Sequence, residues 1–186
     1  IATGAVTTLA GSGQAGSTDG TGTSAKFNYP WGLTTDGSNI YVVDQSNHKI
    51  RKIVISTGVV TTIAGSGSSG STDASGTSAT FNSPTDITTD GTNLYVADNI
   101  NHKIRKIVIS TGVVTTLAGS GSSGSADGTG TAASFNNPYG VIIDGTNLYV
   151  ADRSNYKIRK ISLFGTATAD VAMHNLDDDT DVTVKL

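Results

Sequence analysis

The chain repeats itself every 54 residues, and this period restricts its fold more than any other feature. Residues 47–53 read Asn-His-Lys-Ile-Arg-Lys-Ile, and the same run returns at 101–107 and, with Tyr in place of His, at 155–161. A period of about this length is typical of solenoids, propellers and related arrays. Most of such a sequence serves the architecture, so function is sought where the copies differ.

The composition favours β-structure with many turns. All 15 acidic residues are Asp, and 23 Gly accompany abundant Ser and Thr, a mixture that favours turns over helices. A net charge of −3 gives no reason to expect nucleic-acid binding. No stretch approaches the ~18 apolar residues of a membrane-inserted helix. The chain has no Cys and does not begin with Met. We therefore expect a processed, extracellular or cell-surface protein of bacterial type.

Each copy contains four short segments with the composition of β-strands. Turn residues separate them, and the Asp90-Gly91 pair of the middle copy is a strong hairpin signal. The second and third segments carry apolar residues at both parities, so both faces of the sheet must be covered. A four-stranded antiparallel sheet packed between copies of itself is a propeller blade. In the middle copy the segments are residues 85–89, 93–97, 103–109 and 113–118.

A long loop rich in Gly, Ser and Thr follows the fourth segment and ends in Phe-Asn-x-Pro. We expect the recurring Phe27, Phe81 and Phe135 to anchor this loop on the sheet, because a polar loop of this length would otherwise be mobile. The loop also carries one repeated acidic residue, for which we expect a role in turn formation: Asp19, Asp73 and Asp127.

Other repeated polar residues are interpreted as structural. Asp44 and its equivalents close the second segment, where an Asx turn is expected rather than a Ca²⁺ site. The third segment carries Lys and Arg, such as Arg51, which we expect at the rim with their stems over apolar surface. His48 and His102 become Tyr156 in the third copy. A symmetric zinc site would not survive that change, so the ring is expected to pack beside the turn.

The order of these motifs resembles the NHL repeat. Pro-x-Gly, Asp-Gly-x-Asn-x-Tyr-Val-x-Asp and Asn-His-x-Ile follow one another, best in residues 30–50 and 138–158, although Asp86 replaces the Gly in the middle copy. The resemblance covers residues 3–161. It implies a six-bladed propeller that binds proteins, peptides, RNA or glycans through one face. One branch of the family, the peptide-amidating lyases, uses zinc, but without Cys or Glu we expect no catalytic site and no enzyme activity.

Counting strands predicts how the chain assembles. Residues 3–10, which include Val6 and Thr8, match the fourth strand of a blade, and the remaining strands complete three blades within residues 1–162. Three blades are half of a six-bladed ring and too few to close alone, since propellers have ~4–8. Unpaired edges invite another chain. We expect a homodimer in which each N-terminal strand completes the partner's last blade; the alternative is a fibre or surface-layer subunit joined by open-ended strand donation.

The tail, residues 163–186, alternates apolar and polar residues and is expected to form strands. These are interpreted as a capping hairpin, as the first strands of a truncated next domain, or as assembly strands that dock on a neighbouring subunit and include Val182 and Val184. The acidic residues between them form a weak candidate Ca²⁺ site, the one cofactor considered for the chain: Asp177, Asp179 and Asp181.

The candidate binding residues are those that vary on the constant scaffold. In a propeller, the loop before the first strand and the turn after the second emerge on the same face, and exposed aromatics and Arg there are typical of recognition surfaces. The sequence therefore predicts a non-enzymatic propeller module that assembles with itself and binds a protein, peptide or glycan partner. The face is expected to contain Tyr29, Trp31, Tyr139, Gln45, Asn99 and Arg153.

Overall fold

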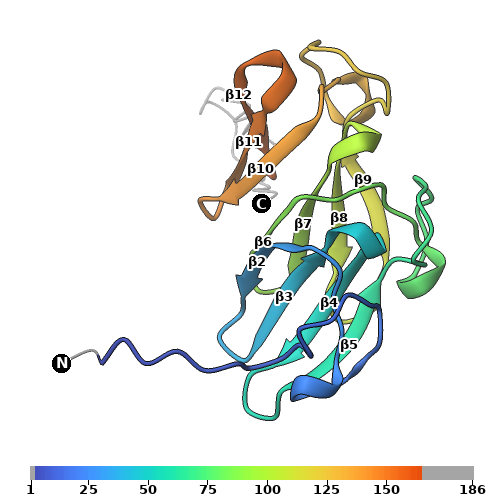
Figure 1. Ribbon diagram of the computed structural model, residues 1–186. Helices are drawn as coiled ribbons and strands as arrows, with labels where there is room; N and C mark the ends of the chain where they lie inside the picture. The colour runs from blue at the N-terminus through green and yellow to red at the C-terminus, as the bar shows by residue number, and fades with distance from the viewer. Residues whose placement is uncertain (1–2, 165–186) are drawn as a thin grey trace, which may run out of the picture.

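The computed structural model describes residues 3–164, which form three antiparallel sheets that follow one another along the chain (Figure 1). Each sheet is a meander in which consecutive strands are neighbours. The first contains β2 (Pro30–Thr35), β3 (Asn39–Asp44), β4 (Lys49–Val54) and β5 (Val59–Ala64), with the short β1 (Gly20–Thr21) on β5. The second contains β6 (Asp86–Thr89), β7 (Asn93–Asp98), β8 (Lys103–Val108) and β9 (Val114–Ala118). The third contains β10 (Pro138–Ile143), β11 (Asn147–Asp152) and β12 (Lys157–Ser162).

These strands confirm the predicted all-β fold and the four predicted segments of the middle copy to within a residue. Short 3-10 turns interrupt the connections. Three lie in the long loops and three follow the second strand of each sheet: η1 (Gly22–Ser24), η3 (Gly76–Ser78), η5 (Gly130–Ala132), η2 (Gln45–Asn47), η4 (Asn99–Asn101) and η6 (Arg153–Asn155).

The hairpin between β2 and β3 shows how the Asp-Gly-x-Asn motif makes a turn. The Asp36 carboxylate accepts the backbone N–H groups of Ser38 and Asn39 at 2.9 and 2.7 Å, and the Tyr41 hydroxyl at 2.9 Å. Gly37 takes the positive φ of 90° that the turn requires. Burial alone would raise the pKa of Asp36, but these hydrogen bonds lower it to about 2.

The sheets pack face to face, and the core lies between them. One cluster joins Val43 and Ile50 of the first sheet to Leu94 of the second. The next cluster joins Ile104 of the second sheet to Leu148 of the third. Both faces of the middle sheet are therefore buried, as the apolar residues at both parities predict, and this is the packing of propeller blades.

The first strands of the three sheets meet at the inner side of the array. The Gly32 N–H donates to the Thr85 carbonyl at 3.1 Å, and the Thr85 hydroxyl donates to the Tyr139 carbonyl at 2.7 Å. Asp86, which replaces the motif Gly, accepts the Val141 N–H at 2.9 Å. The departure from the repeat thus links β6 to β10.

The long loops are clamped by an arginine that the sequence analysis placed wrongly. Arg51 was expected at the rim, but its side chain is fully buried. It donates to Asp44 at 2.6 Å and Asp19 at 2.7 Å, and its guanidinium carbon lies 5.1 Å from the centre of the Phe27 ring. The hydrophobic anchor is confirmed, and a buried ion pair accompanies it.

The same clamp recurs in the other two blades. Its guanidinium joins the carboxylate that closes the second strand to the carboxylate of the long loop, at distances of 2.6 to 2.9 Å. The repeated loop carboxylates, expected only to form turns, therefore hold the loop on the sheet. The two further sets are Arg105 with Asp98, Asp73 and Phe81, and Arg159 with Asp152, Asp127 and Phe135.

The predicted Asx turn at Asp44 is wrong for a related reason. One oxygen of the carboxylate accepts the N–H of Asn28, which lies in the preceding loop, at 2.7 Å. The other accepts the Asn47 amide at 2.9 Å and the Arg51 guanidinium. The carboxylate therefore joins loop, turn and strand rather than bonding backbone amides two residues on.

The repeated His joins neighbouring blades. Nδ1 of His48 accepts the Ser83 N–H at 3.0 Å, and Nδ1 of His102 accepts the Asn137 N–H at 3.0 Å. The ring does lie at the turn, as expected, and its acceptor reaches the next sheet. Tyr156 occupies the equivalent position in the third sheet and is almost fully exposed.

The terminal segments bear on the assembly prediction. Within the part of the chain that the structure describes, residues 3–9 form no strand and run away from the sheets (Figure 1), and Val6 is 95% exposed. The strand expected at residues 3–10 is therefore not formed in the isolated chain. The predicted tail strands and Ca²⁺ ligands lie outside the described residues: Val182, Val184, Asp177, Asp179 and Asp181.

Candidate binding site

Two aromatic residues from different blades meet at the inner side of the array. The ring centroids of Trp31 on β2 and Tyr139 on β10 are 6.1 Å apart, edge to face with an interplanar angle of 86°. Arg153 of η6 places its guanidinium carbon 5.1 Å from the centre of the Tyr139 ring. Trp31 is 49% exposed and Arg153 is exposed. The three residues form the cluster called here the aromatic face.

The local backbone explains why these aromatic side chains project there. Tyr29 and Asn137, the residues before the two prolines, have φ values of 53° and 54°. The pairing of β2 with β3 then shifts register between Pro30 and Leu33, and β10 shifts in the same way after Pro138. Irregularities of this kind re-aim side chains at strand ends, and each aromatic residue directly follows its proline.

The other predicted binding residues divide into accessible and buried ones. Tyr29 is 68% exposed, and Gln45 is half-buried beside it, its backbone N–H donating to the Tyr29 carbonyl at 3.2 Å. Asn99 is buried, and its amide donates to the Pro138 carbonyl at 3.0 Å. Asn99 therefore holds two blades together and is not part of the accessible surface.

Asp86 on β6 contacts the inner strand β10, which contributes Tyr139, through the Val141 N–H. Burial raises the pKa of its carboxyl group, and the N–H groups of Val141 and Ile87 oppose that effect. The carboxylate is already bound to β10, so its observed role is to position that strand.

The chemistry available on the aromatic face is that of recognition. Aromatic rings offer large apolar contact area at low entropic cost, and Tyr hydroxyl, Trp N–H and Arg offer hydrogen bonds. Arg over Tyr is a cation–π contact that also holds the guanidinium in place. Within residues 3–164, no group of three or more His, Cys, Asp or Glu is arranged to hold a metal ion. No helix among these residues has the length and apolarity needed to span a membrane.

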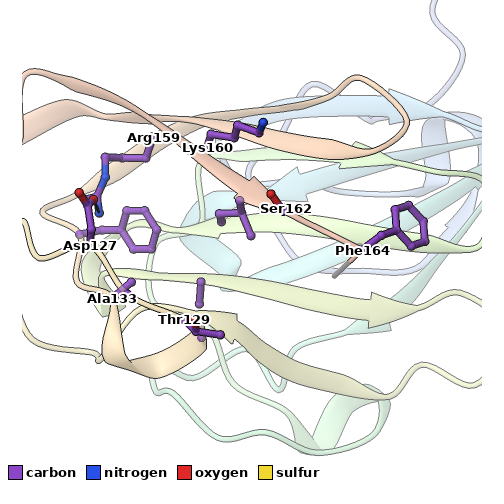
Figure 2. Close-up of a pocket in the computed structure, with 12 residues that line it drawn as sticks. Asp127, Thr129, Ala133, Arg159, Lys160, Ser162 and Phe164 are labelled. Carbon is purple, nitrogen blue, oxygen red and sulfur yellow. Dashed lines mark hydrogen bonds and ion pairs between the residues drawn. The ribbon is translucent and has the colours of Figure 1, made fainter. Parts of the chain in front are cut away.

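Apart from the aromatic face, a pocket lies at the outer edge of the third sheet, beside β12. This pocket of about 590 Å³ has Asp127 and Arg159 at one end and Phe164 at the other (Figure 2). Thr129 and Ser162 also line it. The pocket has no signature in the sequence, because it is formed by the long loop folding back over the strand.

Known proteins share both the repeats and the fold. Human NHL repeat-containing protein 2 is 40% identical over 107 residues, which are 55% of this chain and 15% of the human protein. The chloroplastic protein SUPPRESSOR OF QUENCHING 1 of Arabidopsis thaliana is 32% identical over 165 residues, 83% of this chain and 16% of that protein. The chain thus spans about a sixth of the length of these curated relatives. A search against protein-family models finds no match.

Solved bacterial structures have the same arrangement of sheets. An auxiliary nutrient binding protein from Bacteroides ovatus has a TM-score of 0.59 and 27% identity, over 68% of this chain and 35% of that one. A protein of unknown function from Bacteroides thetaiotaomicron has a TM-score of 0.65 and 29% identity, over 72% and 34% of the two chains. Together with the repeated motifs and the stacked antiparallel sheets, these likenesses identify the architecture. The chain belongs to the NHL-repeat β-propeller family.

Proposed function

We propose that the chain is a non-enzymatic propeller module that binds a protein, peptide or glycan partner through the aromatic face and the adjoining Tyr29 and Gln45. The observation that carries this proposal is the contact of Trp31 with Tyr139, with Arg153 stacked on the same tyrosine. Trp, Tyr and Arg are the residue types that dominate binding hot spots. Here Trp31 and Tyr139 come from strands of two blades, and Arg153 in η6 is already stacked on Tyr139, so little ordering is needed on binding.

The relatives support a binding role and a location outside the cell. Two solved structures of similar fold are described as auxiliary nutrient binding proteins from Bacteroides species, at 26–27% identity. We extend that description to this chain as part of the proposal and assign it to the extracellular space or cell surface. Nucleic acid is not among the proposed partners, because the net charge is −3 and binding to phosphates relies on Lys and Arg. Membrane insertion is not part of the proposal either.

The module is also proposed to assemble with itself into a six-bladed ring of two chains. Leu33 on the outer face of the first sheet is 64% exposed, whereas its equivalents Ile87 and Val141 are 2% and 5% exposed between blades. Ile158 on the opposite outer face is 75% exposed, whereas its equivalent Ile104 is fully buried. The two outer faces thus carry the residues that pack together at the internal junctions. The alternative, a fibre or surface-layer subunit, would use the same faces without closing the ring.

The binding proposal is tested with Trp31→Ala and Arg153→Ala against Ile55→Ala as control. Ile55 is 40% exposed and lies at the turn between β4 and β5, at the opposite end of the strands. Glycan and peptide arrays identify a ligand for the wild-type chain, and the dissociation constant is then measured by quenching of Trp31, the single Trp. Each variant is expected to lose about 2 kcal/mol or more of binding free energy, as hot-spot residues do, which weakens binding at least about thirtyfold. Because Trp31→Ala lacks the fluorophore, its dissociation constant is measured by calorimetry.

Ile55→Ala is expected to bind as the wild type does. A ligand that binds Trp31→Ala and Arg153→Ala with unchanged affinity would show that the aromatic face is not the recognition surface. In that case, the exposed aromatics would be ordinary variation at loop tips.

A further inference from the structure

The pocket beside β12 lies where the first two blades have their fourth strand. In the first two blades, β5 lies beside β4 and β9 lies beside β8, and both are antiparallel to their neighbours. Within the described residues, the third sheet contains β10, β11 and β12, and no strand pairs with the free edge of β12. The pocket lies along that edge, between Lys160 and Ser162 on β12 and Thr129 in the loop (Figure 2).

The fourth strand of the second blade shows which contacts the pocket lacks. There the Thr116 N–H and hydroxyl donate to the Asp73 carboxylate at 2.9 and 3.1 Å, while Asp73 also binds Arg105. The first blade repeats this with Thr62 and Asp19, each contact at 3.1 Å.

In the third blade, Asp127 binds Arg159 at 2.7 Å and has no other side-chain partner among residues 3–164. Its side chain is 95% exposed, compared with 47% and 45% for the two equivalent carboxylates. The pocket therefore presents a preformed acceptor for the backbone and hydroxyl of a Thr in an added strand.

One segment of the chain has the sequence that fits. Residues 3–10 are identical to residues 111–118, which contain β9, except that Ala5 replaces Val113. Thr8 therefore corresponds to Thr116, and in the structure the segment forms no strand and leaves Val6 exposed.

We propose that residues 5–10 of a second copy of this chain fill the pocket as the fourth strand of the third blade. Thr8 then lies opposite Arg159 and donates its N–H and hydroxyl to Asp127, and Thr7 lies opposite Lys160, as Thr115 lies opposite Lys106 in the second blade. This inference rests on the self-assembly proposed above and specifies its partner, its register and its polar contact. It is independent of what the aromatic face binds.

A second copy is the proposed donor, rather than the chain's own residues 3–10, because that segment is tied to the far end of its own chain. The backbone N–H groups of Gly11 and Ser12 donate to carbonyls of the first blade's loop, at 3.1 and 2.9 Å. Six extended residues span only about 20 Å, and the first and third sheets stand at opposite ends of the array (Figure 1). The outer faces that carry Leu33 and Ile158 meet in the same arrangement.

Disulfide trapping tests the proposed register directly, since the chain has no Cys. Residues directly opposite in antiparallel strands have Cα atoms about 4.5–5.5 Å apart, within the range that a disulfide bridges. Full-length Thr7→Cys and Lys160→Cys chains are mixed in a glutathione buffer and analysed on non-reducing gels. We expect a covalent heterodimer as the main product. Thr7→Cys mixed with the control Lys106→Cys, where β9 already occupies the position, is expected to give at least tenfold less.

The double variant Thr7→Cys/Lys160→Cys separates the remaining outcomes. A covalent dimer or a ladder of covalent oligomers supports strand donation between copies, and the ladder excludes the closed ring. A cross-linked monomer would show that the chain's own segment fills the pocket. Absence of any cross-link in a chain that still sediments as a dimer would overturn the strand placement while leaving assembly intact; a monomer without cross-links would overturn both.

A variant that removes the Thr8 hydroxyl checks the assigned contact. Thr8→Val keeps the shape of the side chain but removes the hydroxyl. Loss of a hydrogen bond to a charged acceptor is expected to raise the dissociation constant of the dimer about tenfold for each donated strand. Dissociation constants from sedimentation equilibrium measure the change. Unchanged dimerisation of both Thr8→Val and Asp127→Asn would contradict the contact. Ligand binding at the aromatic face is expected to persist in the separated chains, so failure here and failure of the binding proposal are distinguishable.

Discussion

Removing Arg105 is expected to destabilise the chain far more than removing any exposed basic residue. Its side chain is fully buried and donates to Asp98 at 2.8 Å, to Asp73 at 2.6 Å, and to the carbonyls of Thr80 and Thr72 at 3.0 Å each. In Arg105→Met the Asp98 carboxylate remains buried without its cation. Breaking a buried pair from one side costs about 3–5 kcal/mol, a large part of the stability of a domain of this size.

The magnitude can be separated into its parts by a double-mutant cycle. Asp98 accepts the Asn82 N–H and the Asn101 amide, each at 2.8 Å and on different oxygens. Asp98→Asn removes the charge and keeps one oxygen to accept the Asn82 N–H, whereas its NH2 group cannot accept from Asn101. Adding it to Arg105→Met is expected to recover at least about 1.5 kcal/mol, because the uncompensated charge disappears.

Urea unfolding followed by circular dichroism measures these free energies, with an unchanged slope showing that the unfolded state is comparable. Lys106→Met is the matched control on the same strand, and its effect is expected to stay within about 0.5 kcal/mol. A loss below about 1 kcal/mol in Arg105→Met, or strict additivity in the cycle, would refute the view that the ion pair clamps the loop.

Two further predictions concern the turn at Asp36 and the inner strands. Burial, followed by the hydrogen bond to Asp36, raises the pKa of Tyr41 from 10.0 to about 12. The resulting stabilisation is present below pH 10 and lost as the pH rises towards 12, so the stability difference between wild type and Tyr41→Phe should shrink over that interval in urea titrations; a constant difference would argue against the contact. The pKa of Asp36 is lowered from 3.8 to about 2, so its ionised carboxylate stabilises the folded chain above pH 3.8. This contribution to the free energy of unfolding is lost as the pH falls towards 2. For Gly32→Ala, a Cβ would lie 2.6 Å from a Cα of the next sheet, whereas at Gly140 the nearest atom is 3.7 Å away. Thermal unfolding should therefore show a loss of about 1–3 kcal/mol for Gly32→Ala and little change for Gly140→Ala, and equal losses would contradict the close approach.

The repeat carries most of the fold in its sequence because each strand is bounded by residues that act locally. Asp90-Gly91 sets a turn whatever lies around it, and apolar residues at both parities of residues 93–97 require cover on both faces. The anchoring role of Phe81 also follows from sequence, since a large apolar residue in a polar loop has few other places to go.

What the sequence did not reveal depends on contacts between distant segments. Arg51 looks like its basic neighbours, but its partner Asp19 lies 32 residues away in the folded-back loop. The available signal was that this position is Arg, whereas the other basic residues of the segment are Lys in all three copies, since Arg is the residue that suits a buried ion pair. Asn99 was placed on the candidate face because its position differs among the copies. In the fold its side chain is buried, and its amide donates to the Pro138 carbonyl of the next blade.

The clustering of the candidate binding residues was predicted in part. The aromatic residues were selected because they vary among the copies, and Trp31 and Tyr139 do come together. Their contact depends on β6 bringing β2 and β10 side by side, and on the irregular pairing after each proline. Neither could be read from the spacing of 108 residues between them.

The mass of the assembled particle tests the central proposal, a module that completes its ring with a second copy. Native mass spectrometry and sedimentation velocity on the 18.9 kDa chain measure it over a range of concentrations. The account predicts one discrete species of twice that mass, which Thr8→Val shifts towards the monomer. A stable monomer at all concentrations, or fibres of indefinite length, would contradict the closed two-chain ring.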